Sequence, residues 1–169
     1  NKMFRSYRIM NINFIFILSM SSLVLAQNLI SNGDFEQGNT GFFSEYLYTM
    51  PYIGFEGSYS TSTNPQIVDP AADSYGDHTS GQGLFMIVNG STDPNKIVWS
   101  ISVPVENNEN YIFEMWLSTW YIYFCDSGAI LDIVINDKFL CRIAAPTIPC
   151  VWEKGIASWN SGTSNNATI

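Results

Sequence analysis

Short hydrophobic runs, each broken by turn residues, constrain the fold of this chain most. After residue 26, stretches of β-branched and aromatic residues are interrupted by Gly, Asn, Ser or Pro before apolar residues can recur at the three-to-four spacing of a helix. The sequence therefore predicts strands and no helix here. The clear candidates are 84–89, 96–105, 110–124, 129–136, 139–145 and 151–159, and the weaker ones are 42–49 and 56–63.

Side chains alternate along the longest of these runs. In "NYIFEMWLS" (110–118), every second residue from Tyr111 to Leu117 is apolar, and Trp116 falls on the opposite face. The first face is the predicted core face. "NDK" (136–138) predicts a tight hairpin. Many short strands joined by polar turns indicate an all-β chain, an antiparallel β-sandwich or jelly roll.

The N-terminus has the features of an export signal. Three basic residues lie within the first eight, an apolar run covers 12–26, and small residues precede a predicted cleavage after Ala26. A transmembrane anchor is the alternative, but the run is short for a span. We therefore expect a signal peptide over 1–26 and a secreted, extracellular or cell-surface module over 27–169. Its last strand is expected to begin at Ala167 and to continue past Ile169.

The charge balance excludes some partners. Of the 169 residues, 46% are hydrophobic, enough for a core, but only 13% are charged. Removal of residues 1–26 leaves four basic and fifteen acidic residues, a net charge of −11. An acidic module disfavours nucleic acid, whose binding needs clustered Lys and Arg, and favours hard divalent cations. We also expect no membrane insertion after cleavage. The surface must be largely uncharged and polar, as is common on proteins that contact sugars or other proteins.

Three cysteines lie in the predicted mature part. Because an exported chain meets an oxidising compartment, we expect one disulfide. Cys141–Cys150, which would close a short loop, is the first choice, and Cys125–Cys141 is the alternative.

Two stretches place acids beside turn glycines where strands begin. They are "NGDFEQGNTGF" (32–42) and "GDHTSGQGLFMIVNGS" (76–91). Glycines allow backbone carbonyls to turn inward without steric cost. Carboxylates and carbonyl oxygens are the ligands that calcium prefers.

These stretches carry a family resemblance. "NLISNGDFEQGNTGF" (28–42) resembles the N-terminal signature of carbohydrate-binding modules with the galactose-binding-like jelly-roll fold. "DHTSGQGLFMIVNGS" (77–91) also resembles the equivalent stretch of MAM adhesion domains, and "VWSISVPVENNENYIFEMWLS" (98–118) is similar to the strand pair that follows in both groups. The resemblance covers nearly all of 28–169. It implies a jelly-roll fold, glycan binding without catalysis, and a structural calcium ion.

The resemblance implies Asp34, Glu36 and Asp77 as calcium ligands. The alternative is that they cap turns by accepting backbone hydrogen bonds, and Asp34 is the first candidate for that role. His78, the only histidine, follows Asp77 and precedes Ser80. No GxSxG motif accompanies this trio, so we expect no enzyme activity and a structural His78 that hydrogen-bonds across strands.

Aromatic residues at the end of the long strand are the predicted ligand face. Trp116, Trp120 and Tyr121 could stack on sugar rings, and ordinary packing is the alternative for the tryptophans. The sequence thus predicts a secreted, non-catalytic module that tethers a larger protein to a polysaccharide or surface glycan. A MAM-like adhesion domain that binds a protein partner is the alternative.

Overall fold

The computed structural model describes residues 8–16, 27–120 and 128–169, and these residues are mostly strands. Because they include only one helical turn, the all-β prediction is confirmed. No helix in this described part is long and apolar enough to cross a membrane. The elements are β1 (Arg8–Phe16), β2 (Leu47–Tyr48), β3 (Ser58–Ser62), α1 (Pro65–Val68), β4 (Phe85–Asn89), β5 (Ser102–Pro104), β6 (Asn110–Ser118), β7 (Ile130–Ile135), β8 (Lys138–Ala144), β9 (Glu153–Asn160) and β10 (Asn166–Thr168).

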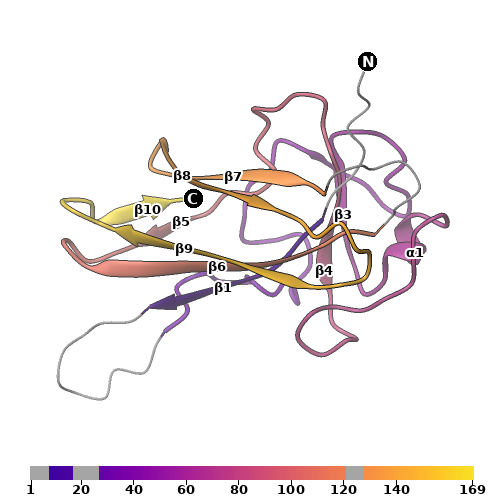
Figure 1. Cartoon of the computed structure of the whole chain (residues 1–169), viewed down its shortest axis with the longest axis horizontal. Coiled ribbons are helices and arrows are strands. Elements are labelled where there is room, and N and C mark those ends of the chain that lie inside the picture. Colours follow the sequence, from indigo (N-terminus) through magenta and orange to yellow (C-terminus); the bar gives the residue numbers. More distant parts are fainter. Residues whose placement is uncertain (1–7, 17–26, 121–127) are drawn as a thin grey trace.

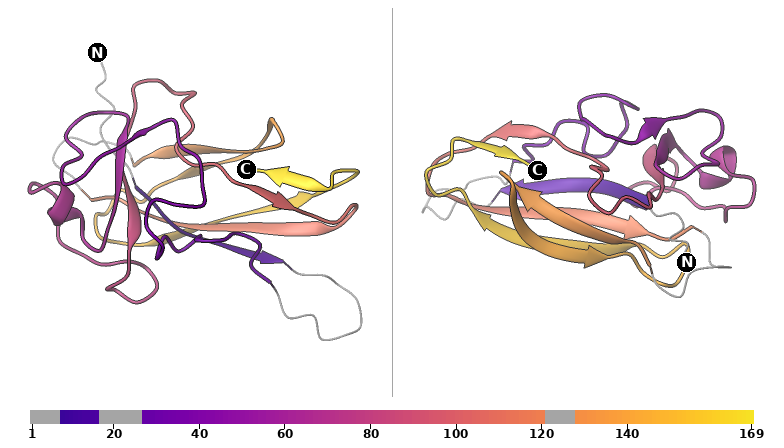
Figure 2. Two further views of the ribbon diagram at one scale, coloured as in Figure 1. Left: turned by 180° about the vertical axis from the view of Figure 1, so that it is seen from behind. Right: turned by 90° about the horizontal axis from the view of Figure 1, so that it is seen from above.

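The strands of the described residues form four small sheets. β6 lies between β1 and β9 in an antiparallel sheet, β7 and β8 form a hairpin, and β5 pairs with β10. In the fourth sheet, β3 lies between β4 and β2, and it runs parallel to β2. Figure 1 and Figure 2 show β3, β4 and α1 at one end of the molecule, with β5, β10 and the C-terminus towards the other end.

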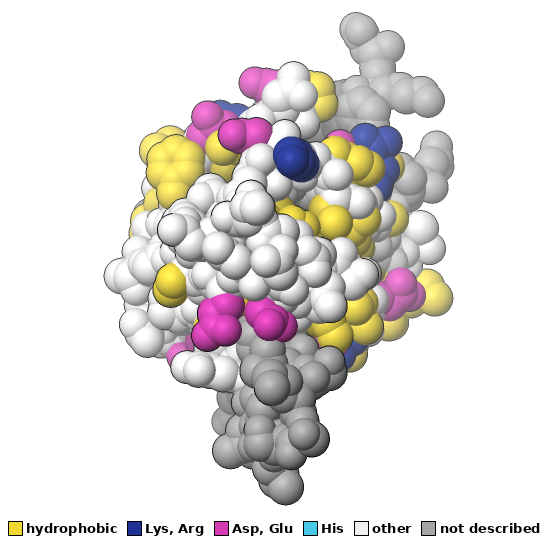
Figure 3. Space-filling model, turned by 90° about the vertical axis from the view of Figure 1, so that its left-hand side faces the viewer, with side chains coloured by type: hydrophobic (Ala, Val, Ile, Leu, Met, Phe, Trp, Pro, Cys, Tyr) yellow, Lys and Arg dark blue, Asp and Glu magenta, His cyan; other side chains and the backbone are white. Residues whose placement is uncertain are grey.

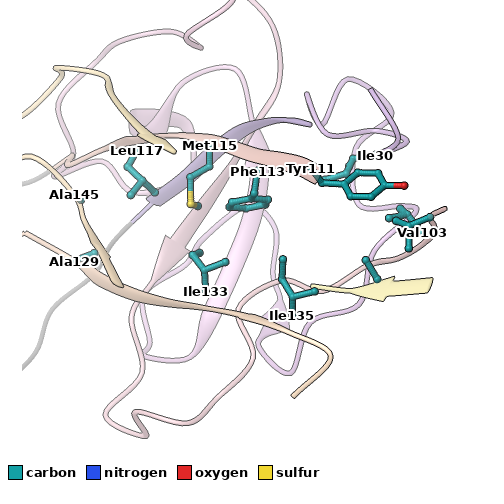
Figure 4. Close-up of a cluster of buried hydrophobic side chains, with 12 residues drawn as sticks. Ile30, Val103, Tyr111, Phe113, Met115, Leu117, Ala129, Ile133, Ile135 and Ala145 are labelled. Atoms are coloured by element: carbon teal, nitrogen blue, oxygen red, sulfur yellow. The ribbon is translucent and has the colours of Figure 1, made fainter. Parts of the chain in front are cut away.

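The main core lies on one face of β6. Its inward side chains, Tyr111, Phe113, Met115 and Leu117, are each 1% exposed, as the alternation predicts. Figure 4 shows Phe113 and Met115 pointing towards Ile133 and Ile135 of β7, and the Tyr111 ring lying towards Val103. Two layers of strands therefore face each other across this cluster, and burial of each such side chain contributes roughly 1.5–3 kcal/mol.

β4 is buried on both faces. Phe85 and Ile87 pack in one cluster with Trp120, whereas Met86 and Val88 pack in another with Phe35. A strand covered on both sides is apolar at successive positions, and this is the pattern of "FMIV". β4 thus joins two clusters outside the main core.

The hairpin predicted at 136–138 is confirmed. A type I′ turn requires positive φ at both central residues, and Asn136 and Asp137 have φ values of 50° and 61°. The Asn136 N–H also donates to the Thr168 carbonyl oxygen at 2.8 Å, and this bond ties the hairpin to β10.

Among the residues that the structure describes, α1 is the one helix; it was not predicted, and it is a single turn. Pro65 occupies its start, and Oδ1 of Asn64 accepts a hydrogen bond from the Gln66 N–H at 2.9 Å. A four-residue helix is too short to show a helical periodicity in the sequence.

Strand β1 lies within the segment predicted as a signal peptide. Arg8–Phe16 pairs antiparallel with β6 along one edge, from Arg8 opposite Ser118 to Phe16 opposite Tyr111. The edge of a strand presents unpaired N–H and C=O groups that another extended apolar segment can satisfy. Cleavage after Ala26 stays a prediction, and it would remove β1 from this edge.

The predicted disulfide is wrong. Cys141 of β8 is a free, half-buried thiol. Because Cys141 belongs to both predicted pairs, neither the bond to Cys150 nor the bond to Cys125 is present. Cys125 itself lies outside the described residues.

The surface agrees with the low charge of the chain. Figure 3 shows one end of the molecule, where uncharged polar side chains and backbone cover most of the described surface and charged side chains form small separate groups. An exposed ion pair between Arg142 and Asp132, at 2.6 Å, connects β8 to β7.

The main core can be tested with a matched pair of substitutions. Phe113→Ala should lower the free energy of unfolding by about 3–5 kcal/mol, because it removes a fully buried ring and leaves a cavity. Phe139→Ala, at a position that is 62% exposed, should change it by no more than about 0.5 kcal/mol. Urea denaturation measures both, and equal effects would contradict this assignment of the core.

Candidate functional site

Two of the three predicted calcium ligands meet at Gly83. Glu36 lies in the turn at residues 36–37, and Asp77 lies in the loop before β4. Oε1 of Glu36 accepts a hydrogen bond from the Leu84 N–H at 3.0 Å. A β-carbon at Gly83 would overlap Glu36 Oε1 and would lie 3.3 Å from Cγ of Asp77. The two motifs that carry the family resemblance are therefore in contact, and only glycine fits between their acids.

Asp77 organises residues 76–83, which we call the Asp77 loop. Asp77 is 5% exposed, and its carboxylate accepts four hydrogen bonds from within the loop. Oδ2 accepts from the N–H groups of Thr79 at 2.7 Å and Ser80 at 2.8 Å. Oδ1 accepts from the Ser80 hydroxyl at 2.9 Å and the Gly83 N–H at 2.7 Å.

These hydrogen bonds also determine the ionisation of Asp77. Burial by itself raises the pKa of a carboxyl group, but the bonds from Ser80, Gly83 and Thr79 stabilise the charged form and hold the pKa of Asp77 below its ordinary value. Asp77 is therefore ionised at neutral pH, although it is buried.

Glycines close the Asp77 loop. A β-carbon at Gly76 would overlap the Gly81 carbonyl oxygen, so the two ends of the turn are in direct backbone contact. Gly81 has a φ of 77°, in the region that glycine adopts without steric cost.

Asp34 does not join the other two acids. Its side chain is exposed, and Oδ1 accepts a hydrogen bond from the Glu36 N–H at 3.3 Å. This is the turn-capping alternative for Asp34.

Asn32 is a structural residue of this site that the sequence analysis did not single out. Its amide nitrogen donates to the carbonyl oxygens of Gly38 and Thr40 at 3.0 and 2.7 Å, and its Oδ1 accepts from the Gln37 N–H at 2.9 Å. Asn32 has a φ of 53°, and the only signal for this conformation in the sequence is its place before Gly33.

The fit to calcium rests mainly on Glu36. No group of three Asp, Glu, His or Cys side chains gathers around one point in the described residues. A carboxylate has about four lone-pair sites, and those of Asp77 are all occupied by donors of its own loop. Oε2 of Glu36 accepts no hydrogen bond in the described part of the chain. A cation here would bind that atom and would share an Asp77 oxygen with its N–H donor.

The predicted ligand face is covered around Trp116. Trp116 is half-buried, and the His78 ring stacks on it with centroids 3.5 Å apart and planes 18° apart. Nζ of Lys154, the residue opposite Trp116 on β9, lies 5.7 Å from the indole centroid. The same ammonium pairs with Glu114 at 2.8 Å. Trp116 is thus the centre of a stacked cluster and is not an open platform.

The other two predicted ligand residues do not form that face either. Trp120 is 3% exposed and packs with Phe85 and Ile87, so the prediction of an exposed ring is wrong and the packing alternative holds. Tyr121 lies outside the described residues. The alternation along β6 shows which side chains share a face, but it does not show that the Asp77 loop covers the second face.

The His78 ring packs against the rings of Trp116 and Trp152. Its Nδ1 atom is buried and has no hydrogen-bond partner in the described structure, and Trp152 meets the ring edge-on at a centroid distance of 6.2 Å. The predicted cross-strand hydrogen bond is therefore wrong for this atom. Ser80 donates to Asp77 rather than to His78, so these three side chains are not arranged as a proton relay.

Comparisons with known proteins add no identification. No family model matches the chain, and no curated protein or solved structure shows significant similarity to it. The resemblance described above therefore stays a prediction.

The environment of His78 predicts a pH dependence of stability. Burial lowers the pKa of His78 below its ordinary value, and nearby Lys154 lowers it further, whereas Asp77 opposes the shift. As the pH falls through about 6.5, the unfolded chain gains a proton before the folded one. The free energy of unfolding should therefore fall from pH 7 towards pH 5. Urea denaturation should show this slope, and His78→Gln should flatten it. An unchanged slope in the variant would contradict the assignment.

Proposed function

We propose that the chain is a secreted, non-catalytic binding module with a galactose-binding-like jelly-roll arrangement, and that it attaches a larger protein to carbohydrate. The observation that carries this proposal is the contact between the two motifs of the resemblance. Segments 28–42 and 77–91 meet where Glu36 and Asp77 flank Gly83. The all-β architecture and the uncharged polar surface support it.

The proposal includes a structural cation at Glu36 and Asp77. Two carboxylates that approach the same glycine repel each other when both are ionised, and a divalent cation between them would remove that repulsion. Calcium suits the site because its oxygen ligands include carboxylates, backbone carbonyls and water. Its role would be to hold the turn of Glu36 against the Asp77 loop.

Calcium and two substitutions separate the cation from simple capping. Added calcium should raise the melting temperature of the chain and chelator should reverse the rise. At hundredfold excess over Kd the stabilisation is about 2.7 kcal/mol. Glu36→Gln should abolish this response, because it removes the charge of the carboxylate whose second oxygen would bind the ion. Glu56→Gln, an exposed acid elsewhere, is the matched control.

Asp77→Asn should behave differently from Glu36→Gln. An amide nitrogen cannot accept hydrogen bonds, so one pair of loop donors would lose its acceptor and the stability should fall by about 1–3 kcal/mol with or without calcium. A melting temperature that ignores calcium in the unmodified chain would remove the cation and leave Asp77 as a cap.

Glycan retention tests the binding function. In affinity electrophoresis, the chain should be slowed by at least one neutral polysaccharide, such as xylan, β-glucan or galactan, relative to a gel without polysaccharide. Hydrogen bonds to hydroxyls and contact with rings provide such binding without a charged ligand. Unretarded migration in every gel would refute the carbohydrate proposal.

One observation favours the alternative, a MAM-like adhesion domain. Segment 43–55 exposes six large apolar side chains, namely Phe43, Leu47, Tyr48, Met50, Tyr52 and Phe55. The segment is anchored at Ile53, which is fully buried and whose N–H donates to the Val68 carbonyl oxygen at 3.1 Å. Aromatic residues and Met are enriched in protein interfaces, and anchored apolar surface marks interaction sites. Capture of a protein partner that Tyr52→Ser weakens, without glycan retention, would favour this alternative.

A further inference from the structure

A cleft beside the Asp77 loop is lined by uncharged polar groups. It has a volume of about 460 Å³ and lies between the end of β3, α1 and the Asp77 loop. Its side-chain lining comprises Thr63, Asn64, Ile67, Ser74, Tyr75 and Gln82. We call it the polar cleft. Its volume is within the range of small-ligand sites.

The lining of the polar cleft indicates the chemistry of its ligand. The Thr63 hydroxyl and the Gln82 side-chain amide can pair with hydroxyl groups, and the Tyr75 ring with the Ile67 side chain can contact C–H surfaces. No Lys, Arg, Asp or Glu contributes to it among the described residues, so it has no counter-ion for a phosphate or a carboxylate. A neutral saccharide, with hydroxyls around a ring that has C–H faces, fits this set.

Part of the lining is already held in place. Asn64 caps α1 through Oδ1 and donates from Nδ2 to the Ser74 hydroxyl at 2.6 Å. The Tyr75 ring stacks on Phe85 with a centroid distance of 6.0 Å. These contacts fix one wall of the polar cleft, and a preformed wall reduces the entropy lost on binding.

Two polar side chains of the lining remain uncommitted. The side-chain amide of Gln82 and the Thr63 hydroxyl make no hydrogen bond with any described residue, and both residues are exposed. They are therefore available to a ligand, in contrast to Asn64, whose amide groups are already used.

The Asp77 loop belongs both to the polar cleft and to the acid pair. Gly76, Gly81 and Gln82 line the cleft, whereas Asp77 and Gly83 of the same loop contact Glu36 or lie beside it. The four hydrogen bonds to Asp77 determine where Gln82 lies. Any change that loosens Asp77 therefore moves one wall of the cleft.

We propose that the polar cleft is a binding site for a neutral saccharide, and that the Asp77 loop positions its Gln82 wall. This inference rests on the proposed carbohydrate-binding function and assigns it a place that is distinct from Trp116. In this site Gln82 and Thr63 contact the sugar hydroxyls. Asp77 is a positioning residue that does not touch the ligand.

Isothermal titration of the chain with xylohexaose, cellohexaose and galactohexaose tests the site. Gln82→Leu and Thr63→Val should each weaken the tightest of these interactions about five- to tenfold, as expected for one lost hydrogen bond. Gln66→Leu, which alters an exposed glutamine of α1 outside the cleft lining, should change it less than twofold. Asp77→Asn should weaken binding at a temperature where the variant is still folded, whereas Asp93→Asn, at a turn cap elsewhere, should not.

The outcomes separate the site from the function. Binding that both cleft variants retain in full would overturn the polar cleft while the carbohydrate-binding function stands. No binding of any neutral oligosaccharide, together with no retention on polysaccharide, would overturn both. Tighter binding of an oligogalacturonate than of the neutral oligosaccharides would overturn the proposed ligand class, because the cleft has no cation to hold its carboxylates.

Discussion

The inward face of β6 is the contact on which the remainder of the architecture depends. Its four apolar side chains are almost fully buried, and the segments that cover them come from well-separated parts of the chain. Ile30 lies before the first motif, Val103 belongs to β5, Ile133 to β7 and Ala167 to β10. Short strands cannot persist alone in water, because a two-stranded ribbon is only marginally stable. The small sheets of this molecule are therefore held in position by the apolar surface that they share with β6.

On the opposite face of β6, the buried charge of Asp77 stabilises a loop by hydrogen bonding. The Asp77 carboxylate accepts four hydrogen bonds from three residues, Thr79, Ser80 and Gly83, so a loop without regular structure has a defined shape. Hydrogen-bond donors of the protein surround this anion, just as oxygen ligands surround a bound metal ion. Glu36 then brings a second negative charge to the same place without donors of its own apart from Leu84. Because, among the described residues, Asp77 accepts four hydrogen bonds and Glu36 only one, a cation at this site would bind mainly to Glu36.

The sequence predicted the features that depend on local pattern. Alternation identified the core face of β6, the residues "ND" identified the turn between β7 and β8, and paired acid–glycine motifs identified two segments that meet. The predictions that were wrong concern which segments of the chain pack against each other. Alternation could not show that His78 covers Trp116, because the two residues lie 38 positions apart along the chain. Nor could it show that Trp120 packs in a core cluster with Phe85 and Ile87, which precede it by more than thirty positions.

The same limit applies to the cysteines and the N-terminus. A pair of thiols spaced for a short loop implies nothing about the direction of their side chains, and Cys141 stays reduced within β8. An apolar run near the start of a chain suits export and also suits pairing with an exposed strand edge, so the composition of 8–16 could not distinguish β1 from a leader. The polar cleft left no pattern at all, since its lining is drawn from residues of ordinary turn composition.

The double burial of β4 has an evolutionary consequence. Successive side chains of β4 fill two different clusters. A change of side-chain volume in one cluster must be accommodated by the neighbours in that cluster, because the adjacent residues of β4 are held in the other cluster. By contrast, Thr63 after β3 and Gln82 of the Asp77 loop are exposed. Descendants of this chain can therefore vary at such exposed positions between β3 and β4, while β4 itself tolerates little change.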